Sequence, residues 1–126
     1  MKPDQRTKHW LIERGGTPWR TEVWHSFAHK KYDLFWIADY VCLFPEMRGL
    51  SGYQVCGEDS KPHLEALLGD ELKAPMLKLW LMCGNPFWVH SWVQRGAKGK
   101  RKLWECHRWQ AIISPEGQVS FERAEE

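Results

Sequence analysis

The segment Lys31–Val55 constrains the fold more than any other part of the chain, because it is strongly apolar and yet carries a carboxylate near its middle. Its pattern predicts two strands, Leu34–Phe44 and Tyr53–Gly57, joined by a turn over Pro45–Gly52. Asp39 falls inside the first of these strands. Burial of an ionised carboxylate is costly unless a metal ion or hydrogen-bond donors compensate it, so Asp39 is the first candidate functional residue.

Helices and further strands are expected on either side of this segment. Both faces of the strand through Asp39 are mostly apolar, which is typical of a strand covered on two sides. The order α-β-β-β-α-β-β predicts an α/β fold with a central mixed β-sheet flanked by helices. We expect helices over Gln5–Arg14, from Pro62 to a break near Gly69, and over Pro75–Cys83, and further strands over Trp19–Trp24, Phe87–Val93 and Leu103–Ile113.

The length of 126 residues suits a single domain with one core. We expect residues 1–117 to form that domain and the charged residues 118–126 to form a frayed tail. No apolar run is long enough to cross a bilayer, and the first residues lack the apolar core of a signal peptide. An intracellular protein without a membrane partner is therefore expected.

Positive charge is concentrated in one segment of a chain whose net charge is only +2. Gln94–Arg108 holds six Lys and Arg residues against one Glu. A local basic loop on a nearly neutral body indicates contact with a polyanion, and a solvated hairpin tip is the alternative.

Five stretches follow one another over roughly Glu22–Cys106: EVWHSFAHKKYDLFWIADYVCL, GYQV, WLMCG, VHSW and GAKGKRKLWEC. In this order they resemble small phage and bacterial proteins of the PD-(D/E)XK nuclease superfamily, which includes Holliday-junction resolvases and restriction-type endonucleases. The resemblance implies a single-domain restriction-endonuclease-like fold and a DNA endonuclease that depends on Mg²⁺ or Mn²⁺. It also implies a structure-selective, resolvase-like homodimer in the cytoplasm of a bacterium or a phage-infected cell.

The resemblance implies a set of metal ligands around Asp39, and hard divalent cations do prefer oxygen ligands. Asp39 would be the principal ligand, Gln54 would offer its side-chain carbonyl, and Val55 would offer its backbone carbonyl. Glu22 would complete the site, with Glu13 as a second candidate for that place. The structural alternatives are a hydrogen-bonded carboxylate at Asp39, a buried amide at Gln54 and a surface residue at Glu22.

The chain departs from the superfamily pattern at Cys56, where a lysine is expected two residues after the acid. A thiol cannot supply the positive charge that stabilises a developing oxyanion. Lys61 is the nearest replacement, and we expect it to reach back from the start of a helix. Because of this departure, the alternative is a DNA-binding protein with weakened or no catalysis. A further alternative is a phage-encoded protein-interaction module, whose tryptophan-rich surface would contact a host partner.

The basic segment is expected to hold the DNA backbone without reading its sequence, because lysine and arginine contact phosphates directly. Trp88, Trp92 and Trp104 lie around it, and core packing is favoured over base stacking for them. The residues expected to contact DNA are Arg95, Lys98, Lys100, Arg101 and Lys102.

Overall fold

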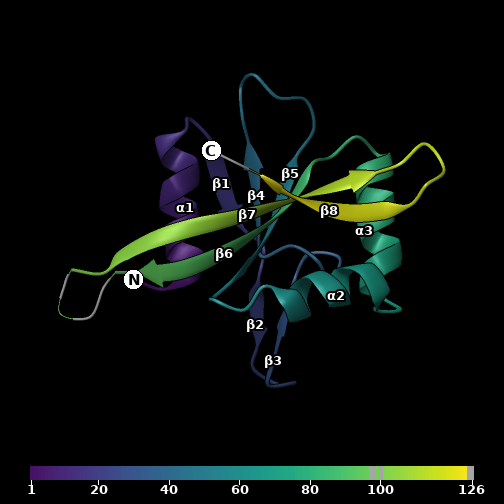
Figure 1. Ribbon diagram of the computed structural model, residues 1–126. Helices are drawn as coiled ribbons and strands as arrows, with labels where there is room; N and C mark the ends of the chain where they lie inside the picture. Colours follow the sequence, from purple (N-terminus) through teal and green to yellow (C-terminus); the bar gives the residue numbers. More distant parts are fainter. Residues whose placement is uncertain (97–98, 100, 125–126) are drawn as a thin grey trace.

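A six-stranded mixed sheet organises the part of the chain that the computed structural model describes, residues 1–96, 99 and 101–124 (Figure 1). Its strand order is β1-β4-β5-β6-β7-β8, in which β5 and β6 run parallel and the other neighbouring pairs run antiparallel. The strands are β1 (Thr17–Arg20), β4 (Tyr40–Leu43), β5 (Ser51–Cys56), β6 (Phe87–Arg95), β7 (Leu103–Ile113) and β8 (Val119–Ala124).

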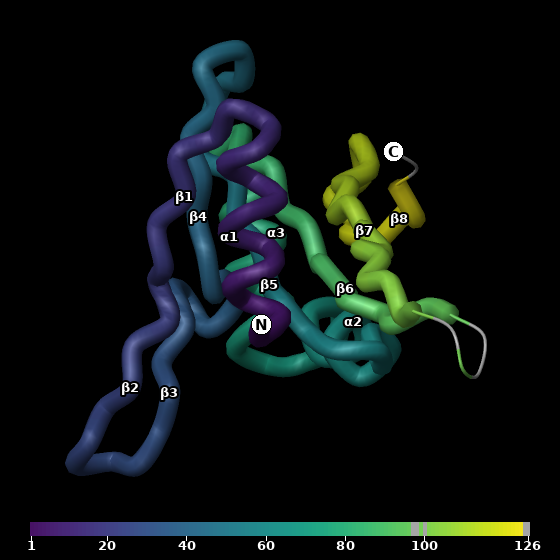
Figure 2. Tube along the Cα trace, turned by 90° about the vertical axis from the view of Figure 1, so that its left-hand side faces the viewer, coloured from purple at the N-terminus to yellow at the C-terminus, as the bar shows by residue number. Residues whose placement is uncertain are grey.

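Helices cover both faces of this sheet. Helix α1 (Pro3–Glu13) lies against one face, and helices α2 (Lys61–Gly69) and α3 (Lys73–Met82) lie against the other (Figure 2). The predicted α/β class with a central mixed sheet flanked by helices is confirmed, although the order of elements differs from the predicted one. None of the helices in the described part of the chain is long and apolar enough to span a membrane.

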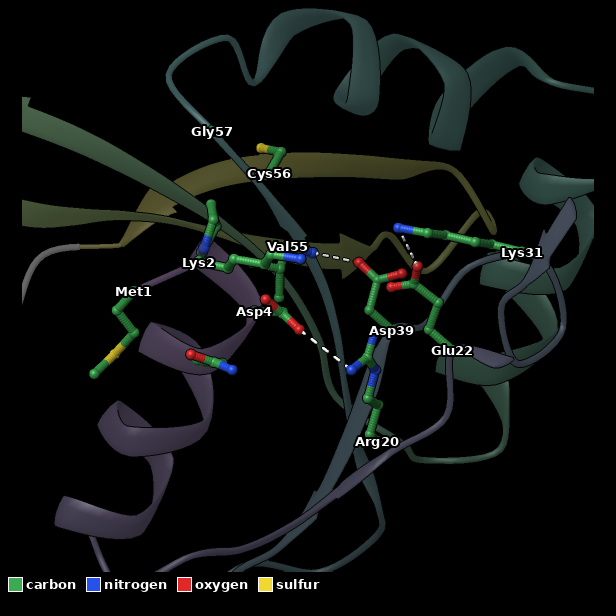
Figure 3. A pocket seen from close by; sticks show the side chains of 12 residues that line it. Met1, Lys2, Asp4, Arg20, Glu22, Lys31, Asp39, Val55, Cys56 and Gly57 are labelled. Carbon is green, nitrogen blue, oxygen red and sulfur yellow. Dashed lines mark hydrogen bonds and ion pairs between the residues drawn. The ribbon is translucent and has the colours of Figure 1, made fainter. Parts of the chain in front are cut away.

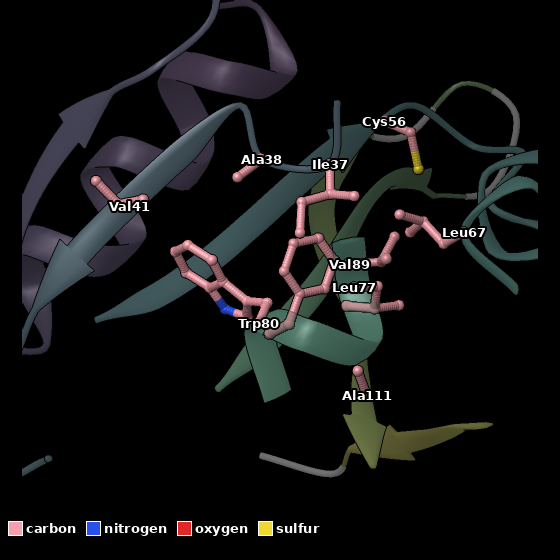
Figure 4. Close-up of a cluster of buried hydrophobic side chains, with 10 residues drawn as sticks. Ile37, Ala38, Val41, Cys56, Leu67, Leu77, Trp80, Val89 and Ala111 are labelled. Atoms are coloured by element: carbon pink, nitrogen blue, oxygen red, sulfur yellow. The ribbon is translucent and has the colours of Figure 1, made fainter. Parts of the chain in front are cut away.

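Alternation along β5 divides the hydrophobic core between the two faces. Tyr53 packs with Leu11 on the α1 side, in a cluster that also contains Tyr40 and Cys42. The larger cluster, on the side of α2 and α3, is drawn in Figure 4 and includes Cys56 from β5. It contains Ile37, Ala38, Val41, Cys56, Leu67, Leu77, Trp80, Phe87, Val89 and Ala111.

The predicted long strand Leu34–Phe44 is wrong in its first half. Leu34 and Ala38 form a bridge that closes a tight turn, and the strand β4 begins only at Tyr40. Phe35 and Trp36 in this turn have φ of 52° and 63°, in the left-handed region that costs side-chain-bearing residues about 1–3 kcal/mol each. The hydrophobic pattern does not predict this turn. Ile37 and Ala38 are fully buried in the turn, and they would be expected to be buried in a continuous strand as well.

A separate two-stranded hairpin replaces part of the expected first strand. Strands β2 (Val23–His25) and β3 (Lys30–Tyr32) pair antiparallel with each other. The hairpin projects away from the sheet and helices, as Figures 1 and 2 both show. The predicted strand Trp19–Trp24 is therefore divided between β1 and β2.

The prediction of a frayed tail from residue 118 is wrong up to Ala124. Strand β8 pairs with β7 along its whole length, from Val119 opposite Ile113 to Ala124 opposite Arg108. Val119 and Phe121 pack against the larger core cluster, while Ser120 and Glu122 alternate with them and are exposed. Alternation between apolar and polar residues is the pattern of a strand with one buried face.

The packing of β8 makes Phe121 a stability determinant. We expect Phe121→Ala to lower the free energy of unfolding by roughly 2 kcal/mol, because it removes a partly buried ring from the core. Glu122→Ala on the exposed face of the same strand is the matched control and should change it by less than about 0.5 kcal/mol. Urea unfolding measures both, and equal effects of the two substitutions would contradict this packing.

Candidate functional site

Three carboxylates converge at the point where the two-stranded hairpin meets the sheet. Glu22 lies between β1 and β2, Asp33 follows β3, and Asp39 immediately precedes β4. Each offers an oxygen, and these oxygens all lie within 4.8 Å of one another. The tight turn between Leu34 and Ala38 reverses the chain, which brings Asp33 back beside Asp39.

Hydrogen bonds to the side chain and to the backbone of Asp39 hold this residue in place. The backbone N–H of Val55 on β5 donates to Asp39 Oδ2 at 2.8 Å. The N–H of Asp39 donates to the Tyr53 carbonyl at 2.8 Å, and its own carbonyl accepts the N–H groups of Thr21 and Glu22 at 2.9 and 3.2 Å. These bonds tie the β1–β2 connection, the start of β4 and strand β5 together at one residue.

Burial raises the pKa of Asp39 to about 8, and repulsion from the Asp33 carboxylate adds to this effect. The hydrogen bond from the Val55 N–H opposes the increase, and the charge of Glu22 adds a smaller increase in the pKa. Without a bound metal ion, the neutral form of the Asp39 carboxyl is therefore favoured at neutral pH. A cation at the carboxylates would favour the charged form and lower this pKa.

Two of the carboxylates, Glu22 and Asp39, line a pocket of about 680 Å³ at the N-terminal end of α1 (Figure 3). Cationic side chains line the same pocket. Lys31 Nζ lies 3.0 Å from Glu22 Oε1, and an Arg20 guanidinium nitrogen lies 3.6 Å from Asp4 Oδ2. The pocket therefore combines an acidic centre with positive charges beside it, a charge pattern suited to an anion that binds together with a cation.

The two predicted ligands on β5 are placed differently from the expectation. Gln54 is 5% exposed and does not line this pocket. It alternates with Val55 along β5, on the face that also carries Cys56. Val55 does line the pocket, but its contact with Asp39 is made by its N–H, whereas the prediction used its carbonyl.

Two other candidates lie away from the carboxylates. Lys61 at the start of α2 is exposed, lies 3.9 Å from Glu65 and does not line the pocket. Glu13, the second candidate for the place of Glu22, is the last residue of α1 and lines different pockets. Of the predicted site residues, the structure thus brings together Asp39, Glu22 and Val55.

Sequence reasoning missed Asp33 and Lys31, which accompany Glu22 and Asp39 in the structure. Both belong to the run KKYD, so their polarity beside an apolar segment was a visible signal. Their approach to Asp39 depends on the tight turn, and its residues read as ordinary strand formers.

Cys56 has no charge to offer at this site. Its side chain packs in the larger core cluster, and burial raises the pKa of the thiol to about 11. A neutral, buried thiol cannot supply the positive charge of a lysine, as expected for this position. Lys31, at the entrance of the two-stranded hairpin, is the cation that contacts an acid of the centre.

The described residues of the basic segment lie at the end of β6, in the connection to β7 and in the first half of β7. Arg95 Nε donates to Glu105 Oε2 at 2.9 Å, so part of its charge is neutralised within the hairpin. Arg101 and Lys102 are exposed, and Lys98 and Lys100 lie outside the described residues. Figure 2 shows the N-terminal end of α1 between this hairpin and the β2–β3 hairpin.

The tryptophans of β6 and β7 are largely engaged in packing. Trp92 is 7% exposed and donates its indole N–H to Thr7 Oγ1 at 2.9 Å. The Arg108 guanidinium lies 4.0 Å from the ring centre of Trp88, and the Arg6 guanidinium lies 4.1 Å from that of Trp104. These faces are covered by cations of the chain itself and form no open stacking platform.

Comparison of the chain with protein-family models, with curated proteins and with solved structures found no match. The superfamily resemblance therefore stays a prediction based on the residue pattern.

The pKa of Asp39 predicts a pH-dependent stability in a metal-free solution. The unfolded chain loses this proton near pH 3.9, whereas the folded protein keeps it up to about pH 8. Stability is therefore full below the lower value and falls as the pH rises through the upper one. Asp39→Asn lacks this carboxylate, so its unfolding free energy should rise relative to the parent protein over this range, on the order of a few kcal/mol.

Urea unfolding of both proteins in EDTA, at pH values from about 4 to 9, measures this difference. Glu58→Gln, at an exposed carboxylate outside the cluster of Glu22, Asp33 and Asp39, controls for the loss of one acidic group. Parallel pH profiles of the parent and Asp39→Asn would show that Asp39 titrates as an ordinary carboxyl group.

Proposed function

We propose that this chain is a metal-dependent nuclease whose reaction centre is formed by Glu22, Asp33 and Asp39. The supporting observation is the convergence of these three carboxylates, with their oxygens within 4.8 Å of one another, beside a pocket that Glu22 and Asp39 line. Like charges at this separation repel, and burial of Asp39 increases the cost. A bound cation relieves both penalties, and a set of carboxylate oxygens suits Mg²⁺ or Mn²⁺.

The residues of the centre would have different roles in phosphodiester hydrolysis. When bound, a divalent cation would polarise a phosphate oxygen and lower the pKa of a coordinated water. Asp39, oriented by the Val55 N–H, would hold that cation together with Glu22 and Asp33. Lys31 would neutralise charge on the phosphate, which is the role that Cys56 cannot fill.

DNA is the proposed substrate because positive charge flanks the pocket. Arg20 and Lys31 line the pocket itself, and the β6–β7 hairpin carries the exposed Arg101 and Lys102. A DNA backbone held by lysine and arginine would be oriented without sequence readout. If the enzyme cuts paired strands symmetrically, as a resolvase does, it acts as a two-fold dimer, and a homodimer is part of the proposal.

Cleavage assays with branched, single-stranded and duplex DNA, in Mg²⁺ or Mn²⁺, test the centre directly. Asp39→Asn should abolish metal-dependent cleavage because it removes the most buried of the three carboxylates. Lys31→Ala should slow cleavage roughly 100-fold, as loss of one electrostatic contact to the reacting group does elsewhere. Lys61→Ala is the matched control and should cleave like the parent, since Lys61 lies outside the pocket.

The outcomes of this assay separate the alternatives. Cleavage that survives Asp39→Asn would overturn the proposed centre, and a slow Lys61→Ala beside a normal Lys31→Ala would exchange the roles of the two lysines. DNA binding without cleavage would support a DNA-binding protein on the same scaffold. A chain that neither binds nor cuts DNA would favour a protein-interaction module.

Metal binding also has a signature that is independent of activity. A ligand present at about 100 times its dissociation constant stabilises a folded protein by about 2.7 kcal/mol. At a pH slightly above 8, Mg²⁺ or Mn²⁺ should therefore raise the melting temperature of the parent by several degrees and leave Asp39→Asn nearly unchanged. Differential scanning fluorimetry with NaCl at matched ionic strength measures this, and equal shifts in both proteins would argue against the site.

A further inference from the structure

The β2–β3 hairpin has no packing partner that explains its composition. Within the described residues it forms a sheet of its own two strands, and all six strand residues are exposed. It projects from the body of the protein beside the acidic pocket (Figures 1 and 2). We propose that this hairpin binds unpaired bases of a nucleic-acid strand by stacking them on Trp24 and Phe27.

Large aromatic side chains are exposed along the whole hairpin. Phe27, in the turn at its tip, is 94% exposed, and Trp24 on β2 is 57% exposed. Tyr32 at the end of β3 is 45% exposed. Aromatic rings gathered on one projecting element mark an interaction surface, whereas single exposed apolar residues need no such explanation.

The charge of the hairpin identifies the kind of partner. Residues 23–32 contain Lys30, Lys31, His25 and His29 and no acidic residue. Exposed aromatic rings combined with positive charge are the means by which proteins bind single-stranded nucleic acids, because every base has a face that can stack and every linkage carries a negative charge. Two copies of this hairpin would bring like charges together, which disfavours a second copy of the chain as the partner.

The register of the hairpin connects this surface to the acidic centre. Trp24 lies directly opposite Lys31, so the two side chains share one face of the hairpin. Lys31 Nζ is 3.0 Å from Glu22 in the pocket. A base stacked on Trp24 therefore places its own phosphate near Lys31 and next to the carboxylates.

The inference rests on the proposed function for its nucleic-acid partner and names the part of the substrate that the site receives. That part is a stretch of unpaired nucleotides, as found at a branch point or a single-stranded end. The tryptophans of the β6–β7 hairpin do not offer the same surface, because Trp88 and Trp104 already carry arginine side chains on their rings.

Fluorescence anisotropy in EDTA tests the binding step without cleavage. The probes are a fluorescein-labelled oligothymidylate and a duplex of the same length. The double variant Trp24→Ala/Phe27→Ala should bind the oligothymidylate about tenfold more weakly or worse, since each stacked base contributes measurably to affinity. Its affinity for the duplex should not change, because duplex bases are already stacked on one another.

Trp19→Ala is the matched control, because Trp19 is 74% exposed but lies on β1 of the main sheet. It should bind both probes like the parent. Both variants should also keep the parent's urea midpoint, because the substituted side chains are exposed and the hairpin stands apart from the core.

Unchanged affinity of the double variant for oligothymidylate would overturn the inference. If the double variant also sediments at a lower mass than the parent protein, the hairpin is instead a contact between copies of the chain. Asp39→Asn should bind oligothymidylate in EDTA like the parent. A protein that binds through the hairpin but never cuts would leave this inference intact and overturn the proposed nuclease alone.

Discussion

The hydrogen bond from the Val55 N–H to Asp39 Oδ2 is the interaction on which the candidate site depends. It anchors the carboxylate to strand β5, while the backbone of Asp39 bonds to Tyr53 on the same strand and to the β1–β2 connection. One N–H donor offsets only part of the cost of burial and of repulsion from Asp33, so the pKa stays raised. The centre is therefore electrostatically unbalanced, and a proton or a cation restores the balance. This imbalance is the physical basis of the proposed metal-dependent chemistry.

Ion pairs between acidic and basic side chains surround the three carboxylates. Lys31 is paired with Glu22 and Arg20 with Asp4, so the pocket presents both the ligands of a cation and the partners of an anion. Two hairpins flank the N-terminal end of α1, where this pocket lies (Figure 2). In the proposed function, the exposed Arg101 and Lys102 of the β6–β7 hairpin would contact phosphates of the nucleic acid. The exposed aromatic rings of the β2–β3 hairpin would stack on its unpaired bases.

Much of the fold could be predicted because the relevant signals are local. Proline and glycine mark the ends of α2 and α3, and alternation of apolar residues marks β6 and β7, whose observed bounds contain the predicted ones. The prediction failed where an apolar run is compatible with either a strand or a tight turn. Phe35 and Trp36 have strong strand propensity, yet they adopt a left-handed turn because burial of Ile37 and Ala38 compensates the strain. Strand β8 was missed for a related reason, since its charged residues outweighed the alternation of Val119 and Phe121.

The sequence by itself determined that this is an α/β chain with one costly acid, Asp39, beside an apolar strand, and that Cys56 leaves no lysine on the neighbouring strand. Composition and periodicity suffice for these statements because each statement concerns a single helix or strand. Only the tertiary structure decided which groups surround Asp39. Asp33 and Lys31 join Glu22 there because a turn of a few residues brings them back beside Asp39. Gln54 does not, because the face alternation of β5 directs it to the other side, and Lys61 at the start of α2 lies outside the pocket. Such directions depend on packing between distant segments, and a residue pattern along the chain does not contain them.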